Sequence, residues 1–206
     1  MKLSQDITTI FSSETNEQST FGDSLKRINH KSFGVFLAVL ALPSALPIPA
    51  PGYSTPFGIL LVALGVQIAI NRQYLWFPKF VKDKPLPSAK ESKMLQGMIR
   101  FLEFFEQFLK PRIKVLSKGV FYRFVGVLVM FCGLSMILPI PLTNTIPAFG
   151  TFLLGLGLME EDGVAILLGA LTAVLGIGFT SLIIYLFTRF GLEGVNTFKD
   201  WIKSLI

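Results

Sequence analysis

The sequence predicts an all-α membrane protein with two repeated, proline-tipped helical hairpins, one full transmembrane helix and interfacial amphipathic helices. The 206-residue chain is 51% apolar and only 16% charged, whereas soluble domains carry about a quarter charged residues. Residues 32–71, 124–159 and 163–188 contain no Asp, Glu, Lys, Arg or His. Each stretch exceeds the ~20 residues that a helical crossing needs. Two Leu-Pro-Ile-Pro sequences, at 46–49 and 138–141, divide the first two stretches.

An internal repeat relates these two stretches. A shift of 92 residues aligns 31–66 with 123–158 without gaps and gives twelve identities in 36 positions. Shared apolar character does not explain the matched prolines and glycines, which include Pro47/Pro139, Pro49/Pro141, Gly34/Gly126, Gly58/Gly150 and Gly65/Gly157. The match indicates an internal duplication, a construction that recurs in membrane transporters.

Each repeat is predicted to contain two short helices. Apolar runs at 33–46 and 124–138 end at the Leu-Pro-Ile-Pro sequence, because proline lacks an N–H and disfavours helix in the residue before it. A polar turn follows, and a second apolar run begins near Thr55-Pro56 and near Ile146-Pro147. Pro is favoured at the first helical position, and Thr or Asn ahead of it can cap the helix.

Helix length favours re-entrant hairpins. A run of ~14 residues spans roughly 21 Å, less than the ~30 Å hydrocarbon core. We therefore expect each proline tip to lie inside the membrane, where protein or a water-filled cavity must surround it. The tips should then meet each other or a partner subunit. The alternative is two tilted full crossings per repeat, with the prolines in an outer loop.

The predicted segments are a polar N-terminal segment ending in a short amphipathic helix (1–31), hairpin repeat 1 (32–71), a basic linker (72–118), hairpin repeat 2 (119–159), a transmembrane helix (160–189) and an interfacial C-terminal helix (190–206). The linker carries eleven Lys/Arg against four acids, which places it in the cytoplasm. Its residues 91–116 have apolar residues near helical spacing and predict an interfacial amphipathic helix, whose far end Pro111 limits. The single complete crossing is expected over 163–188.

Small residues line one face of that crossing at Ala165, Gly169, Ala173, Gly176 and Thr180. Such a face lets helices approach closely. It can pack within the chain or form a homodimer, and the sequence leaves both open.

The two Leu-Pro-Ile-Pro motifs, together with Gly58, Asn144, Pro147 and Gly150, resemble the ExoD family. The stretch Gly155-Leu-Gly-Leu-Met-Glu-Glu-Asp-Gly163 and the run from Gln67 through Arg72 to Trp76-Phe77-Pro78 are also similar to that family's pattern. The resemblance covers roughly 30–190. It implies a multi-pass protein of the bacterial inner (plasma) membrane that is linked to exopolysaccharide synthesis, and it supplies no known reaction.

The two tips are the candidate site. A helix begins after each proline motif, and helix N-termini favour anions. Converging N-termini at mid-membrane are typical of transporter substrate sites. The predicted binding residues for an anionic or lipid-linked glycan substrate are Pro47, Pro49, Ser54, Thr55, Pro139, Pro141, Thr143, Asn144 and Thr145, with Arg72 and Arg123 near the hairpin mouths. Alternatively, these residues cap helices and extend to lipid headgroups.

Glu160, Glu161 and Asp162 form an acidic cluster beside the apolar stretches. They are candidates for a proton or ion pathway, or they stabilise the start of the helix that follows. One histidine and one cysteine leave no metal site, no cofactor is predicted, and no recognition motif indicates nucleic acid. No catalytic constellation can be assembled, so we expect no enzyme.

The leading functional hypothesis is support of exopolysaccharide production by binding or translocating the anionic or lipid-linked substrate. A membrane scaffold for a polysaccharide synthase is the second hypothesis. An ion or proton pathway that changes the envelope is the third.

Overall fold

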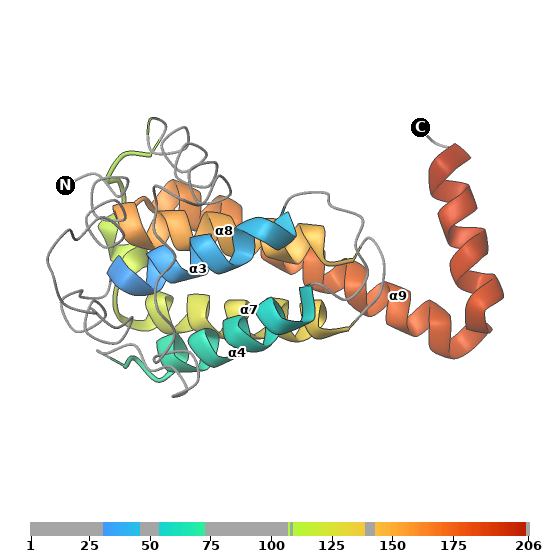
Figure 1. Cartoon of the computed structure of the whole chain (residues 1–206). Coiled ribbons are helices and arrows are strands. Elements are labelled where there is room, and N and C mark those ends of the chain that lie inside the picture. The colour runs from blue at the N-terminus through green and yellow to red at the C-terminus, as the bar shows by residue number, and fades with distance from the viewer. Residues whose placement is uncertain (1–30, 46–53, 73–106, 108, 139–142, 205–206) are drawn as a thin grey trace, which may run out of the picture.

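The computed structural model describes residues 31–45, 54–72, 107, 109–138 and 143–204 (Figure 1). Within these ranges all regular structure is helical, as predicted. The elements are α3 (Lys31–Ala45), α4 (Ser54–Ala69), the short 3-10 helix η1 (Lys114–Ser117), α7 (Gly119–Ile137), α8 (Thr145–Glu160) and α9 (Gly163–Ser204). The predicted N-terminal segment and its short helix lie outside the described residues.

Helices end where the proline motifs begin. α3 stops at Ala45 and α7 at Ile137, two positions that differ by the repeat spacing of 92 residues. α4 then begins at Ser54 and α8 at Thr145, 91 residues apart. Pro56 and Pro147 each occupy the third position of their helix, where a missing N–H breaks no intrahelical bond.

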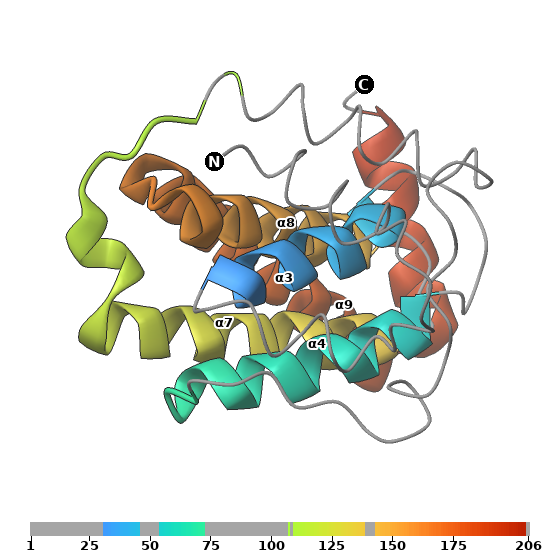
Figure 2. The ribbon, with the colours of Figure 1, turned by 60° about the vertical axis from the view of Figure 1, so that its left-hand side comes forward.

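The helices of one repeat pack on those of the other. α3 lies antiparallel against α8, and α4 lies antiparallel against α7 (Figures 1 and 2). Glycines bring the backbones together: a Cβ added to Gly34 would lie 2.6 Å from the Gly155 carbonyl oxygen, and one added to Gly65 would lie 2.8 Å from that of Gly126. Gly126 is the repeat counterpart of Gly34. The same position of the repeat therefore makes the close backbone contact in the α3–α8 pair and in the α4–α7 pair.

The small-residue face of α9 packs within the chain. Gly169, Ala173 and Gly176 lie against Leu154, Gly150 and Pro147 of α8, in antiparallel order. This contact occupies the face for which the sequence left a homodimer open. The opposite face of α9 is exposed and apolar.

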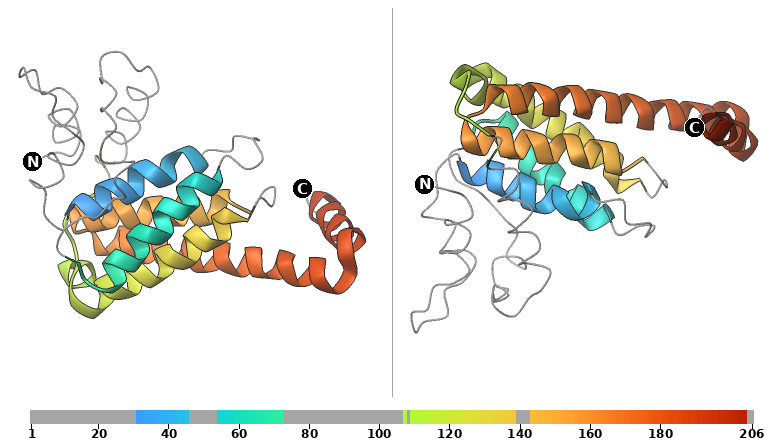
Figure 3. Two further views of the ribbon diagram at one scale, coloured as in Figure 1. Left: turned by 60° about the horizontal axis from the view of Figure 1, so that its bottom comes forward. Right: turned by 90° about the horizontal axis from the view of Figure 1, so that it is seen from above.

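α9 extends well past the other helices (Figure 3). Its 29-residue span from Gly163 to Gly191 gives about 43 Å, whereas the 16 residues of α8 give about 24 Å. At Gly191 the backbone leaves helical geometry with φ 64° and ψ −156°, and the helix then continues to Ser204 in a new direction. This conformation is almost restricted to glycine.

Among the residues that the structure describes, two helices are long and apolar enough to cross a membrane: Gly119–Ile137 and Gly163–Gly191. α7 begins five residues before the predicted run at 124–138, so it reaches a crossing length that the sequence analysis assigned only to 163–188. Large apolar side chains are exposed along both helices, including Phe121, Phe124, Phe131, Leu134, Leu167, Leu168, Leu171, Val174 and Leu175. Such a surface is suited to contact with lipid or with a partner protein.

The predicted amphipathic helix over 91–116 falls mostly outside the described residues. The structure describes only its far end, where residues 109–113 are not helical and η1 follows at 114–117. Pro111 lacks an N–H and disfavours helix before it. Ile113 has the left-handed φ of 51°, which also ends a helix.

Candidate functional site at the helix ends

Four helix ends gather at one end of the bundle, here called the tip end. It comprises the C-termini of α3 and α7 and the N-termini of α4 and α8 (Figure 1). The Thr55 hydroxyl donates to the Ile137 carbonyl oxygen at 3.3 Å, which joins the start of α4 to the end of α7. Antiparallel packing of α3 on α8, set by the Gly34–Gly155 approach, brings the end of α3 beside the first turn of α8.

Polar side chains are buried at the tip end. Ser44 and Thr143 are each 1% exposed and Ser54 is 2% exposed. The Thr143 hydroxyl donates to the Asn144 Oδ1 at 3.4 Å. Burial of such groups costs free energy unless they are hydrogen-bonded, so each needs a partner.

Ser44 has no such partner. Its buried hydroxyl makes no hydrogen bond within the part of the chain that the structure describes. Other buried hydroxyls in these helices donate to the carbonyl four residues earlier, as Thr151 does to Pro147 at 2.9 Å and Thr180 does to Gly176 at 3.0 Å. Ser44 therefore retains hydrogen-bonding capacity that a ligand or water can use.

The expected capping role of Asn144 is wrong. Asn144 precedes α8 with helical φ and ψ and makes no side-chain cap hydrogen bond. Thr55 also donates across to α7 instead of accepting from its own helix. Neither Asn144 nor Thr55 therefore accepts a hydrogen bond from the first N–H groups of α8 or α4.

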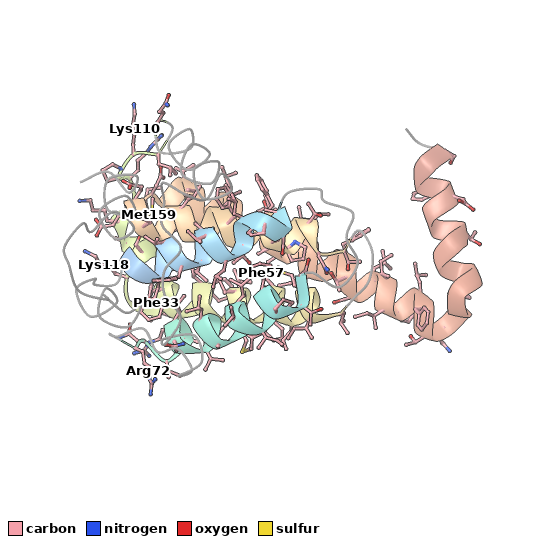
Figure 4. All side chains as sticks on the ribbon, in the orientation of Figure 1. Phe33, Phe57, Arg72, Lys110, Lys118 and Met159 are labelled. Atoms are coloured by element: carbon pink, nitrogen blue, oxygen red, sulfur yellow. The ribbon has the colours of Figure 1, made fainter. Side chains whose placement is uncertain are left out.

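The predicted binding residues separate into two groups. Ser54, Thr55, Thr143, Asn144 and Thr145 lie at the tip end, and Pro47, Pro49, Pro139 and Pro141 lie outside the described residues. Arg72 is at the opposite end, here called the mouth end, where Lys110 and Lys118 also lie (Figure 4). Arg123 is in the second turn of α7, the helix that begins directly after Lys118. About 24 Å, the length of a 16-residue helix, separates the two groups.

The acidic cluster holds the mouth end together. Asp162 is buried, and its Oδ1 accepts from the backbone N–H of Val164 at 2.9 Å and of Ala165 at 3.4 Å. Its Oδ2 accepts from the Lys110 N–H at 2.9 Å and lies 3.9 Å from the Arg112 Nε. Glu161 pairs with Lys114 at 3.5 Å. Both Asp162 oxygens are thus used in capping α9 and fixing the segment before η1.

Comparison with known proteins places this arrangement in a family. The family described as "Exopolysaccharide synthesis, ExoD" matches residues 3–182. The chain belongs to the ExoD family. An uncharacterized protein of Synechocystis sp. is 36% identical over 205 residues, covering 98% of this chain and 96% of the relative. Protein ExoD of Rhizobium meliloti is 29% identical over 168 residues, covering 80% of this chain and 70% of the relative.

No solved structure matches this ExoD-family chain. The family link supports the predicted association with exopolysaccharide synthesis. Together with the two apolar helices it also supports membrane association. Within the described residues no group of three or more His, Cys, Asp or Glu can hold a metal ion.

Ser44 is not among the binding residues predicted from the sequence. A signal was present, since Ser44 follows Pro43 inside an otherwise apolar run and its repeat counterpart is the apolar Met136. Only the structure shows that this hydroxyl is buried without a partner among the described residues.

Proposed function

We propose that this protein supports exopolysaccharide synthesis by binding or translocating an anionic group at the tip end, as a multi-pass protein of the inner membrane. The substrate is a phosphate carried by a lipid or a glycan precursor. The N-termini of α4 and α8 supply N–H groups and partial positive charge, and Ser44, Ser54 and Thr143 supply hydroxyls.

The depth of the tip end carries this proposal. Gly176 of α9 packs on Pro147 in the first turn of α8. Gly176 lies 13 residues (about 20 Å) after Gly163 and 15 residues (about 22 Å) before Gly191. If Gly163–Gly191 of α9 crosses the membrane and α7, which ends at the tip end, does not, the tip end lies near the bilayer centre, as expected for a re-entrant hairpin and not for an outer loop.

Polar groups near the bilayer centre are unfavourable in free energy, so their presence there suggests a function. Non-helical backbone in the hydrocarbon region requires protein or a water-filled cavity around it, and polar residues there commonly mark substrate pathways. Paired broken helices with N-termini directed at an anion are a recurrent transporter design.

The test combines exopolysaccharide output with direct binding. Ser44→Ala and Thr143→Val each remove one hydroxyl, and Thr172→Val is the matched control because Thr172 donates at 2.8 Å to its own helix at Leu168 on the exposed surface. Loss of a hydrogen bond to a charged group costs about 1.5–3 kcal/mol, or roughly 10- to 100-fold in affinity. A polyprenyl phosphate in nanodiscs is the binding probe.

We expect both tip variants to lower polysaccharide output and to weaken binding of the probe, with the control unchanged and all three proteins present in the membrane at equal levels. Wild-type output and affinity in both tip variants would falsify the tip site and favour the scaffold hypothesis.

A further inference from the structure

The segment before α7 joins basic and apolar side chains on one exposed surface. Lys110, Arg112, Lys114, Lys118 and Arg123 are all exposed. Between them, large apolar side chains are exposed as well: Ile113, Val115, Val120, Phe121 and Phe124. Val120 is 78% exposed. We call these ten residues the mouth surface.

The backbone of the mouth surface is held in place. The Gly163 N–H donates to the Arg112 carbonyl oxygen at 2.6 Å, and the Lys110 N–H donates to Asp162 at 2.9 Å. Within η1 and its flanks, Leu116 donates to Ile113 at 3.1 Å and Lys118 donates to Val115 at 3.2 Å. The side chains are therefore presented from a fixed backbone rather than from a free loop.

The charge of this surface is only partly neutralised. Glu161 pairs with Lys114, and Asp162 lies near Arg112. Lys110, Lys118 and Arg123 have no ion pair within the described ranges. They are the cations that remain for an external anion.

We propose that the mouth surface binds the anionic phospholipid headgroups of the adjacent leaflet. The mouth end precedes the uncharged part of α9 and so lies at the boundary between water and hydrocarbon if α9 crosses the membrane. Exposed apolar side chains enter the acyl region while neighbouring cations meet headgroup phosphates. This inference depends on the membrane placement of α9 and not on a ligand at the tip end.

The experiment uses the purified full chain in nanodiscs that contain phosphatidylglycerol or phosphatidylcholine with identical acyl chains. The variant Lys110→Gln/Lys118→Gln/Arg123→Gln removes the three unpaired cations. Arg189→Gln is the matched control, since Arg189 is exposed near the opposite end of the crossing segment of α9. Bound lipids are counted by native mass spectrometry, and the thermal midpoint is measured in parallel.

We expect phosphatidylglycerol to bind preferentially to the wild type and the control, with binding weakened by high salt. Each basic residue near an anionic surface contributes about fivefold to binding. The triple variant should therefore bind phosphatidylglycerol roughly 100-fold more weakly than the wild type. Equal retention of phosphatidylglycerol by triple variant and wild type overturns the proposal. So does equal retention of the two lipids by the wild type.

A second arm separates the headgroup from free phosphate and does not depend on the triple variant's folding. Inorganic phosphate is titrated against the wild type in phosphatidylcholine discs. We expect phosphate to leave the thermal midpoint of the protein unchanged, because the apolar side chains of the mouth surface need the acyl chains of a lipid. Stabilisation equal to that by phosphatidylglycerol overturns the lipid proposal in favour of a free-anion site.

Discussion

Two single polar side chains, Thr55 and Asp162, hold helix ends in place in this protein. Thr55 is the clearest joining residue, because its hydroxyl reaches the last carbonyl of α7. Asp162 completes the start of α9 and at the same time fixes Lys110. The two side chains lie at opposite ends of the bundle, so they can be tested independently.

Thr55→Val should lower the free energy of unfolding by about 1 kcal/mol, the usual net value of one hydrogen bond. Valine keeps the shape of threonine, so packing is preserved. Thr172→Val is the control, and we expect it to change stability less because the Thr172 hydrogen bond is exposed and lies within its own helix. Reversible unfolding in mixed micelles measures both, and equal effects would contradict a joining role for Thr55.

Asp162→Asn should destabilise the fold by about 1–3 kcal/mol, because its amide NH₂ group must face an N–H donor that the carboxylate accepted. Glu161→Gln, which weakens a half-exposed ion pair with Lys114, should cost less than about 1 kcal/mol. The same unfolding measurement compares them. A large cost for Glu161→Gln and none for Asp162→Asn would mean that the ion pair, and not the cap, holds this end.

At the scale of the elements, the proline motifs predicted where the helices end. They did not predict which helices pack against each other. α3 and α7 stop directly before or at Leu-Pro-Ile-Pro because the backbone chemistry of proline is local. The exchange of partners between repeats depends on glycine-mediated contacts between Gly34 and Gly155 and between Gly65 and Gly126, which are distant in sequence.

Gly65→Ala should separate α4 from α7. The added Cβ would lie 2.5 Å from the Met130 backbone nitrogen and 2.8 Å from the Gly126 oxygen, and backbone atoms cannot move aside as a flexible side chain can. Overpacking of this kind costs about 1–3 kcal/mol. A lower thermal midpoint in nanodiscs is the expected result.

Gly178→Ala is the matched control, because a Cβ at that position on α9 meets nothing within 4 Å. Alanine is a better helix former than glycine by about 1 kcal/mol, so this variant should be neutral or slightly stabilised. Equal destabilisation of the two variants would show that helix backbone effects, and not the α4–α7 contact, determine the result.

At the scale of the whole molecule, a bundle of short helices lies beside one long helix. The sequence predicted short helices from the ~14-residue apolar runs and a full crossing at 163–188. It did not show that α8 would begin beside Gly176, halfway along that crossing, because such a register arises from small-residue contacts between α8 and α9. The types of the candidate tip residues were therefore predictable from the sequence, and the position of the α8 start beside the middle of α9 was not.

This register makes a prediction about membrane depth. Ile59, near the start of α4, and Ile70, just past its end, are both exposed apolar residues. They lie 11 residues apart, about 16 Å along a helix. Re-entrant hairpins place Ile59 near the bilayer centre and Ile70 near a surface, whereas two full crossings with an outer proline loop place Ile59 near the other surface.

Nitroxide labels on single cysteines in a Cys132→Ser background measure these depths by their relative accessibility to oxygen and to a water-soluble nickel chelate. Gly178→Cys supplies the mid-membrane reference on α9, and Val164→Cys supplies the surface reference. We expect the label at Ile59 to match Gly178 and the label at Ile70 to match Val164. A nickel accessibility at Ile59 as high as at Val164 would put the proline tips in water and remove the physical basis for an anion site within the membrane.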